Sequence, residues 1–314
     1  MLIVPHRRAA GKPGGMPLPA QHSNRKARQI HMVELSNVTK NYGRAQVLQN
    51  ICLTLDEPSI YCLLGRNGAG KTTLLKAMAG YVPLSQGRIT VDGRPISTAC
   101  METGVSYIEN FARHFNLPVR RLLHIAGGLD TSFDFAFAQE MMERFELDGA
   151  KKFRQLSLGM KTMVSTIICL ASNRSLILLD EPVLGFDAIM RMEFYDMLAQ
   201  SWKRRPRIII VSTHIIEEIA QTIQKLIILD KGRVRFFDTL AAVDAMACSV
   251  SGLRHEVDAA VQGQNVIGRD DVGGLSTAYV FGTPPKAQGS LCVEKLSLQD
   301  FFIQTVKGNG GRIK

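Results

Sequence analysis

Two kinds of hydrophobic pattern alternate along the chain. Uninterrupted apolar runs are typical of strands buried on both faces of a parallel sheet, and they occupy residues 59–65, 175–181 and 207–213. Apolar residues at helical spacing predict helices over residues 72–80, 117–128, 135–147, 190–202 and 217–224. Strands that alternate with helices predict an α/β fold with a mostly parallel sheet covered on both faces.

The other strand-like segments are amphipathic or short, and the predicted fold includes an antiparallel β part. Amphipathic or short strands bounded by turn residues are expected at 33–43, 47–56, 87–93 and 104–110, and a hairpin is expected at 225–238. After about residue 240 the pattern weakens. It favours strands over residues 253–263, 276–282 and 291–298, followed by a final helix over residues 298–306.

The helical block between residues 114 and 160 interrupts the strand–helix alternation, which predicts a helical subdomain at about 110–160. The chain is therefore expected to divide into three parts. These are a tail at 1–31, a main α/β domain at 32–240 and a small C-terminal extension at 241–314.

Composition and charge narrow the class of protein. The 314 residues are 46% hydrophobic, enough for a sizeable core, yet no uninterrupted apolar run approaches the ~18 residues that span a bilayer. Any membrane role would therefore depend on a partner. Residues 1–31 carry six of the ten net positive charges and no acid, and their Gly- and Pro-rich composition predicts disorder. The tail is interpreted as solvated or as an extension ahead of a start at Met32, and the alternative is a basic arm that touches anionic lipid or RNA.

The segment between the first buried run and its helix matches the phosphate-loop pattern GxxxxGK[ST], also called Walker A. Glycines allow backbone N–H groups to turn toward phosphate oxygens, and the start of the following helix favours anions. Lys71 is expected to reach the outer phosphates, while the Thr72 hydroxyl is expected to bind Mg²⁺. The predicted nucleotide-binding residues of this loop are Gly65, Arg66, Asn67, Gly68, Ala69, Gly70, Lys71, Thr72 and Thr73.

Two acidic residues end a later buried run. Asp180 and Glu181 follow the apolar residues of segment 175–179, and carboxylates at the carboxyl end of a parallel strand lie where open α/β sheets bind ligands. We expect Asp180 to hold Mg²⁺ through water and Glu181 to polarise the attacking water. The two acidic residues and the phosphate loop together predict a P-loop NTPase.

The order of these motifs resembles that of the ATP-binding cassette (ABC) ATPases of membrane transporters, over roughly residues 32–240. The segment Leu156–Met160, LSLGM, is similar to the family signature LSGGQ. The resemblance implies that Ser157 and Gly159 touch the γ-phosphate bound to the opposite subunit. It also implies roles for Tyr42 in stacking on adenine, for Asp187 in linking the two nucleotide sites, and for His214 as a switch that contacts the γ-phosphate.

The sequence departs from the family pattern at two places. Where the family usually has glutamine, this chain has Glu109 and Asn110; the spacing favours Asn110 as a metal or water ligand, and both alternatives stay open. In the signature, Leu158 and Met160 replace glycine and glutamine. This variant of the signature resembles that of exporter-type cassettes.

The resemblance implies a function and partners. The expected function is ATP binding and hydrolysis, with Mg²⁺, in the ATPase subunit of an exporter, with Lys71, Glu181 and His214 as catalytic residues. The expected partners are a second cassette, identical or different, and an integral-membrane permease that contacts the helical block. The chain would then be cytoplasmic and peripheral on the membrane. Two alternatives are a soluble cassette ATPase that acts on nucleic acid or ribosomes, although nucleic acid is an unlikely partner for a single cassette, and a non-hydrolysing module that gates a channel.

Overall fold

The computed structural model describes residues 32–99, 104–109, 115–286 and 289–308. The basic tail at 1–31 and Asn110 lie outside the described residues, so the interpretations placed on them stay predictions. Within these ranges, none of the helices combines the length and the apolar character that crossing a bilayer requires.

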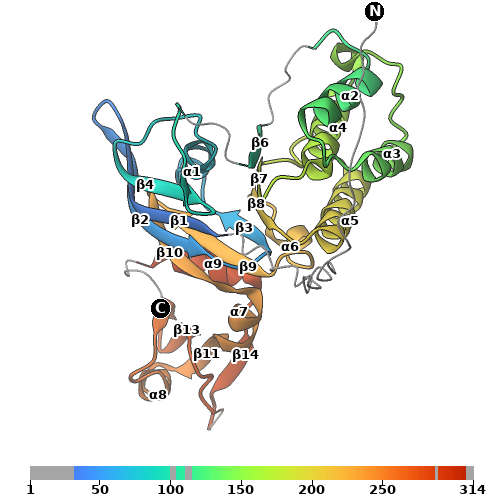
Figure 1. The fold of residues 1–314 in the computed structure, drawn as a ribbon. Coiled ribbons are helices and arrows are strands. Elements are labelled where there is room, and N and C mark those ends of the chain that lie inside the picture. The colour runs from blue at the N-terminus through green and yellow to red at the C-terminus, as the bar shows by residue number, and fades with distance from the viewer. Residues whose placement is uncertain (1–31, 100–103, 110–114, 287–288, 309–314) are drawn as a thin grey trace, which may run out of the picture.

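The centre of the molecule is a six-stranded sheet in the order β10-β9-β3-β8-β7-β6 (Figure 1). Strands β3, β6, β7, β8 and β9 are parallel, and only β10 at the edge is antiparallel. The strands are β3 (Ile60–Leu64), β6 (Val105–Glu109), β7 (Leu176–Asp180), β8 (Ile208–Thr213), β9 (Lys225–Asp230) and β10 (Arg233–Thr239). This sheet confirms the predicted α/β class.

A four-stranded antiparallel sheet lies beside it, in the order β2-β1-β4-β5. It confirms the antiparallel β part expected at the N-terminal side. Its strands are β1 (Val33–Tyr42), β2 (Ala45–Leu55), β4 (Gln86–Val91) and β5 (Arg94–Pro95).

Alternation along the central strands produces two hydrophobic cores. Successive side chains point to opposite faces of a sheet. Tyr61 and Leu63 of β3 face α1 and the antiparallel sheet, whereas Cys62 and Leu64 belong to the core shared with the other helices. The central strands are almost uniformly apolar because both faces are covered.

The helices confirm most of the periodic segments of the sequence. They are α1 (Lys71–Met78), α2 (Val119–Leu129), α3 (Phe135–Arg144), α4 (Leu158–Ala171), α5 (Ala188–Arg204), α6 (Ile216–Ile219), α7 (Leu240–Met246), α8 (Arg254–Ala260) and α9 (Leu298–Lys307), with a 3-10 turn at Phe153–Gln155. Helices α2, α3 and α4 gather on one side of the central sheet, away from α1 (Figure 1).

Two secondary-structure predictions are wrong. The segment 253–263, for which strand was favoured, contains helix α8, whose Val257 packs in a small core with Val261. The helix expected over 217–224 ends at Ile219, and Gln224 instead pairs with β3: its backbone N–H donates to the carbonyl oxygen of Ile60 at 3.0 Å, and its side chain accepts from the backbone N–H of Ile60 at 2.6 Å. This contact holds the end of the segment against the central sheet.

The C-terminal sheet consists of β11 (Ala247–Leu253), β12 (Val266–Val272), β13 (Leu275–Phe281) and β14 (Cys292–Lys295), in the order β12-β13-β11-β14. It lies below the central sheet in Figure 1. Three buried rings attach it to the rest of the chain: Phe236 of β10, Phe281 of β13 and Phe301 of α9, with centroids 4.9–5.5 Å apart. The attachment is therefore a packed core. The domain boundary at about residue 240 stays a prediction.

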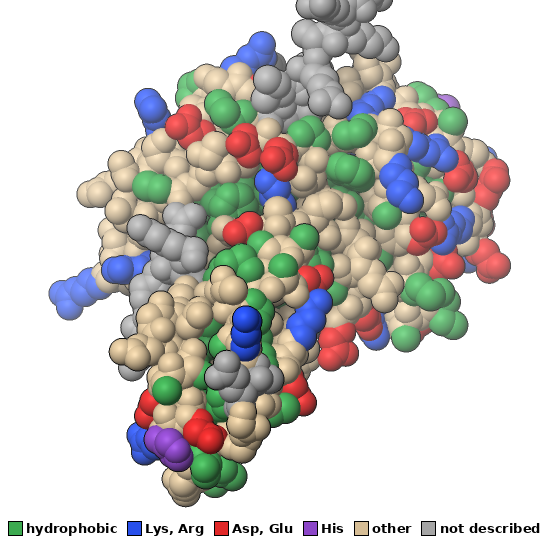
Figure 2. All heavy atoms as spheres, turned by 90° about the horizontal axis from the view of Figure 1, so that it is seen from below, with side chains coloured by type: hydrophobic (Ala, Val, Ile, Leu, Met, Phe, Trp, Pro, Cys, Tyr) green, Lys and Arg blue, Asp and Glu red, His purple; other side chains and the backbone are tan. Residues whose placement is uncertain are grey.

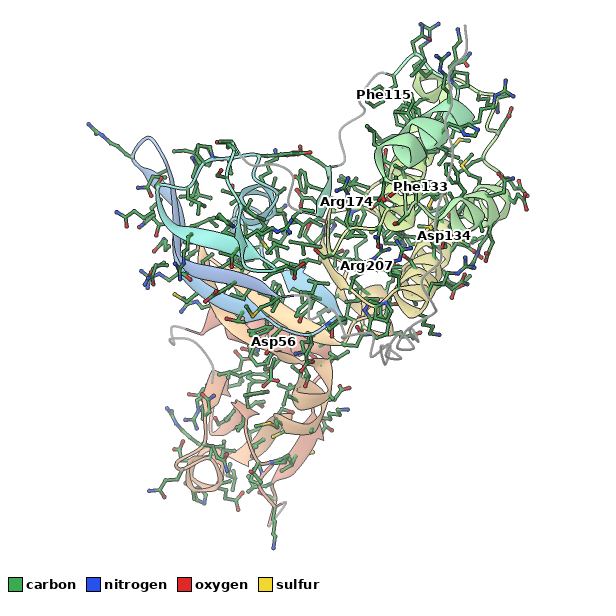
Figure 3. All side chains as sticks on the ribbon, viewed as in Figure 1. Asp56, Phe115, Phe133, Asp134, Arg174 and Arg207 are labelled. Atoms are coloured by element: carbon green, nitrogen blue, oxygen red, sulfur yellow. The ribbon has the colours of Figure 1, made fainter. Side chains whose placement is uncertain are left out.

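A buried arginine joins the helical region to the central sheet. Arg207, just before β8, donates to the carbonyl oxygens of Ser172 at 2.6 Å and Leu170 at 2.5 Å, which lie at the end of α4 (Figure 3). Burial lowers the pKa of Arg207 to about 10, and the group stays charged at neutral pH. Helix ends leave carbonyl groups without partners inside the helix, and this cation satisfies two of them.

Candidate functional site

The phosphate loop connects β3 to α1, as its sequence predicts. Gly70 precedes the helix with a φ of 105°, a left-handed conformation that favours glycine. Gly65 lies so close to β9 that an added Cβ would stand 2.5 Å from the carbonyl oxygen of Leu229. Both glycines are therefore required by the path of the loop, which places Lys71 at the start of α1.

Lys71 is buried and points back into the loop. Its Nζ donates to the carbonyl oxygen of Gly65 at 2.8 Å and lies 3.5 Å from a carboxylate oxygen of Glu181. The side chain is 7% exposed, so these oxygens supply the polar contacts that a buried ammonium requires. The ammonium group of the loop and the acidic strand end thus meet, as the order of motifs predicts.

Asp180 is held by two hydroxyl groups. Ser212 of β8 donates to its Oδ1 at 2.6 Å, and Tyr107 of β6 donates to its Oδ2 at 3.4 Å. Burial and, next, the charge of Asp180 raise the pKa of the Tyr107 hydroxyl, which keeps that group protonated as a donor. The carboxylate is therefore fixed at the carboxyl end of β7 by the strands on both sides.

Glu181 has an unusual backbone conformation, with a φ of 47°. Such a left-handed residue other than glycine is uncommon and marks sites where surrounding contacts enforce strain. Here the amide N–H of Glu181 donates to the Oγ of Ser212 at 2.9 Å. The carboxylate then lies between Lys71 and His214, whose Nδ1 is 2.8 Å from Glu181 Oε2. The His214 ring is 54% exposed, so a ligand can reach it.

Glu109 ends β6 directly opposite Asp180 in the parallel register. Its carboxylate forms an ion pair with Lys76 of α1 at 2.5 Å. The pair links the helix that begins at the phosphate loop to the edge strand of the sheet. Asn110 lies outside the described residues, so the choice between Glu109 and Asn110 as the counterpart of the family's glutamine stays a prediction.

The signature residues lie at the start of α4, in the helical region. The Oγ of Ser157 accepts a hydrogen bond from the amide of Met160 at 3.2 Å, which caps the helix. Gly159 is buried against the ring of Phe186. Figure 1 shows α4 on the opposite side of β6–β8 from α1, so within one chain the signature stands apart from the phosphate loop.

The two remaining predicted site residues are exposed. Asp187 caps α5 by accepting from the amide of Met190 at 2.9 Å. Tyr42 ends β1 with its ring 48% exposed, and the Nζ of Lys40 lies 4.8 Å from the ring centroid. The ring is therefore supported by a cation while much of its surface stays accessible.

Comparison with known proteins identifies the family. Residues 48–184 match the family described as ABC transporter. The taurine import ATP-binding protein TauB of Escherichia coli (strain K12) is 33% identical over 218 residues, which cover 67% of this chain and 84% of TauB. The chain belongs to the ABC transporter family. It is an ATP-binding cassette, and members of this family hydrolyse ATP, work in pairs and associate with membrane permeases.

Further relatives agree with this assignment. The ABC transporter ATP-binding protein YtrB of Bacillus subtilis (strain 168) is 28% identical over 252 residues, covering 79% of this chain and 86% of YtrB. A solved ATP-binding subunit of an ABC transporter covers 68% of this chain and 91% of its own, with a TM-score of 0.60 and 23% identity. The dimeric structure of the cassette MJ0796, bound to ADP and Pi, covers 66% of this chain and 98% of its own chain, with a TM-score of 0.58 and 21% identity. These two structures show the fold.

Sequence reasoning missed three residues of this cassette's site. Ser212 contacts both Asp180 and the amide of Glu181. In the sequence, only its position two residues before His214 could have pointed to a role in the site. Tyr107 and Lys76 contact the ends of β7 and β6 from other elements. These contacts depend on the order of strands in the sheet, which a motif does not contain.

Proposed function

We propose that Glu181 is the general base for ATP hydrolysis in this cassette. The proposal rests on the position of its carboxylate between Lys71 and His214 at the carboxyl ends of the central strands. A water molecule attacks the γ-phosphorus while Glu181 accepts its proton. The bond from the γ-phosphorus to the bridging oxygen breaks, and ADP and phosphate leave. Lys71 and His214 stabilise the charge that develops on the phosphate oxygens.

We propose that Mg²⁺ is held by the Thr72 hydroxyl, the nucleotide phosphates and water positioned by Asp180. Hard oxygen donors suit this ion, which keeps several of its waters. Thr72 is exposed at the start of α1, and each oxygen of Asp180 has a lone pair beyond the one that its hydroxyl partner uses. Among the described residues no group of three His, Cys, Asp or Glu side chains could hold a metal alone, which fits an ion that arrives with ATP.

We propose that the remaining predicted residues complete the nucleotide site across two cassettes. The adenine stacks on the accessible face of Tyr42, and the backbone of residues 65–73 surrounds the phosphates. Ser157 and Gly159 of one cassette face the γ-phosphate bound to the other, and Asp187 links the two sites. The separation of α4 from α1 in one chain supports this arrangement, because a signature that touches nucleotide must then come from a second chain.

We propose that this cassette powers an exporter formed with a separate permease. The signature residues Leu158 and Met160 support export. The import activity in the name of TauB favours the second candidate, a nutrient importer. Reconstituting the cassette with its co-purifying membrane protein in vesicles decides between them. ATP supplied on the cassette side should drive cargo away from that side; movement toward it establishes the importer. Co-purification with ribosomes would establish the soluble alternative.

Replacing His214 with alanine should lower kcat for ATP hydrolysis by about 10²-fold, since a donor to transition-state charge is removed. The Kd for ATP should change by no more than about twofold, because the backbone of the loop carries most of the ground-state contacts. Turnover assays and binding of a fluorescent ATP analogue measure the two effects. His255→Ala, on exposed α8, is the control. Equal losses in binding and turnover would show a structural histidine.

A further inference from the structure

Lys40 of β1 is a buried cation that the proposed ATP site does not use. Several Lys and Arg side chains project from the surface shown in Figure 2, whereas Lys40 is only 9% exposed. A buried ammonium group requires a partner that offsets its charge. Within the part of the chain that the structure describes, no carboxylate pairs with Lys40, and its Nζ lies over the ring of Tyr42 at 4.8 Å from the ring centroid. The negative face of this ring is therefore its partner.

The backbone of β1 places the two side chains together. Residues two apart on a strand point to the same face, so Lys40 and Tyr42 share one. Lys40 pairs with Leu48 of β2, and the next residue of β1 pairs with Gln46, which leaves one extra residue on β2. A β-bulge of this kind increases the local twist and re-aims side chains. The contact between Lys40 and Tyr42 is therefore set by the strand pair itself.

The same pair of strands lies against the phosphate loop. A Cβ added to Gly70 would stand 3.0 Å from a methyl carbon of Leu48 on β2. The turn between β9 and β10 connects the two as well, because Gly232 donates to the carbonyl oxygen of Ala69 at 3.0 Å and accepts from the amide of Gln49 at 2.8 Å. The ring at the end of β1 is therefore held in a fixed relation to the loop that surrounds the phosphates.

We propose that Lys40 is a positioning residue for the nucleotide base. The inference rests on the proposed stacking of adenine on Tyr42 and deepens it. The ammonium group of Lys40 lies over the ring and holds it in one orientation before the nucleotide arrives. The ring is 48% exposed, so the base has a surface on which to stack while Lys40 stays in place. The ordering of the ring, which would otherwise weaken binding, is thus completed on folding.

Stacking of the base strengthens the contact between Lys40 and the ring. The base removes water from Tyr42, and the attraction between a cation and an aromatic ring is stronger where water is excluded. The contact therefore stabilises the nucleotide-bound state more than the free state, which lowers the Kd for nucleotide. The base is the same in ATP and ADP, so this contribution does not depend on the γ-phosphate. A lysine that contacts the phosphates directly would favour ATP over ADP instead.

Calorimetric titration of the full chain with ADP and with a non-hydrolysable ATP analogue tests the proposal. Lys40→Met removes the charge and keeps the length of the side chain, and it should raise both Kd values by the same factor, about threefold to tenfold. Lys40→Arg should keep them within about twofold of the wild type, because guanidinium also lies over aromatic rings. Lys225→Met is the matched control: its Nζ lies 5.9 Å from the ring centroid of Tyr61, at the end of the central sheet away from the loop. Its Kd values should match those of the wild type.

A double-mutant cycle shows whether Lys40 acts through the ring. Tyr42→Leu should raise the Kd for both nucleotides, and adding Lys40→Met to it should change the Kd by less than about twofold, since the ring is already gone. An equal effect of Lys40→Met in both backgrounds, or a larger effect on the ATP analogue than on ADP, would overturn the proposal.

The two single variants separate this inference from the function on which it rests. Wild-type binding by Tyr42→Leu would mean that adenine does not stack on Tyr42, and both proposals would then fail. Weakened binding by Tyr42→Leu together with wild-type binding by Lys40→Met would leave the stacking in place and refute the role of Lys40 alone.

Discussion

Replacing Glu181 with glutamine is expected to slow ATP hydrolysis by about 10²–10⁴-fold, the range that a general base contributes. Glutamine preserves the shape of the side chain and cannot accept a proton from water. The contact with Lys71 Nζ keeps an oxygen acceptor, so ATP binding should persist. Phosphate release in single-turnover assays measures the chemical step directly.

A second measurement on the Glu181→Gln variant examines the pairing of cassettes. Because the variant binds ATP without cleaving it, a nucleotide-dependent dimer should accumulate, and sedimentation would detect it. Glu217→Gln is the control, because Glu217 is an exposed carboxylate on α6, near the site in the chain. A Glu181→Gln variant with wild-type turnover would refute the assignment of the base and favour a module that does not depend on hydrolysis.

Replacing Phe301 with alanine is expected to lower the free energy of unfolding by about 3–5 kcal/mol, as for other buried aromatic residues. The ring is fully buried between Phe236 and Phe281, so its removal leaves a cavity where the C-terminal sheet meets the cassette. Urea denaturation followed by circular dichroism measures the change. Phe302→Ala on the same helix is the matched control, because Phe302 is only partly buried.

The comparison of the two phenylalanine variants tests how the C-terminal sheet is attached. Phe302→Ala should lower the free energy of unfolding by less than half as much as Phe301→Ala, because it removes less buried apolar surface. Similar costs would mean that the whole of α9 stabilises the cassette without a special role for the ring cluster. A Phe301→Ala variant as stable as the wild type would contradict the packing of the three rings.

Short-range patterns determined much of the fold. Buried strands on both faces of a sheet must be uniformly apolar, so the runs that contain β3, β7 and β8 were visible without a structure. The phosphate loop was equally visible, because its path requires glycine at Gly65 and Gly70. The wrong prediction over 253–263 overlooked a local signal: Leu253, Val257 and Val261 recur every four residues, as apolar residues do on one face of a helix.

The sequence by itself predicted the residues that we propose to carry the chemistry: the lysine of the loop, the two acids after a buried strand and the histidine after the next one. Only the tertiary structure decided how they meet. The register of β6, β7 and β8 places Tyr107 and Ser212 on either side of Asp180, and Ser212 holds the strained backbone of Glu181. Contacts between strands far apart in the chain depend on strand order and register, which no local pattern specifies.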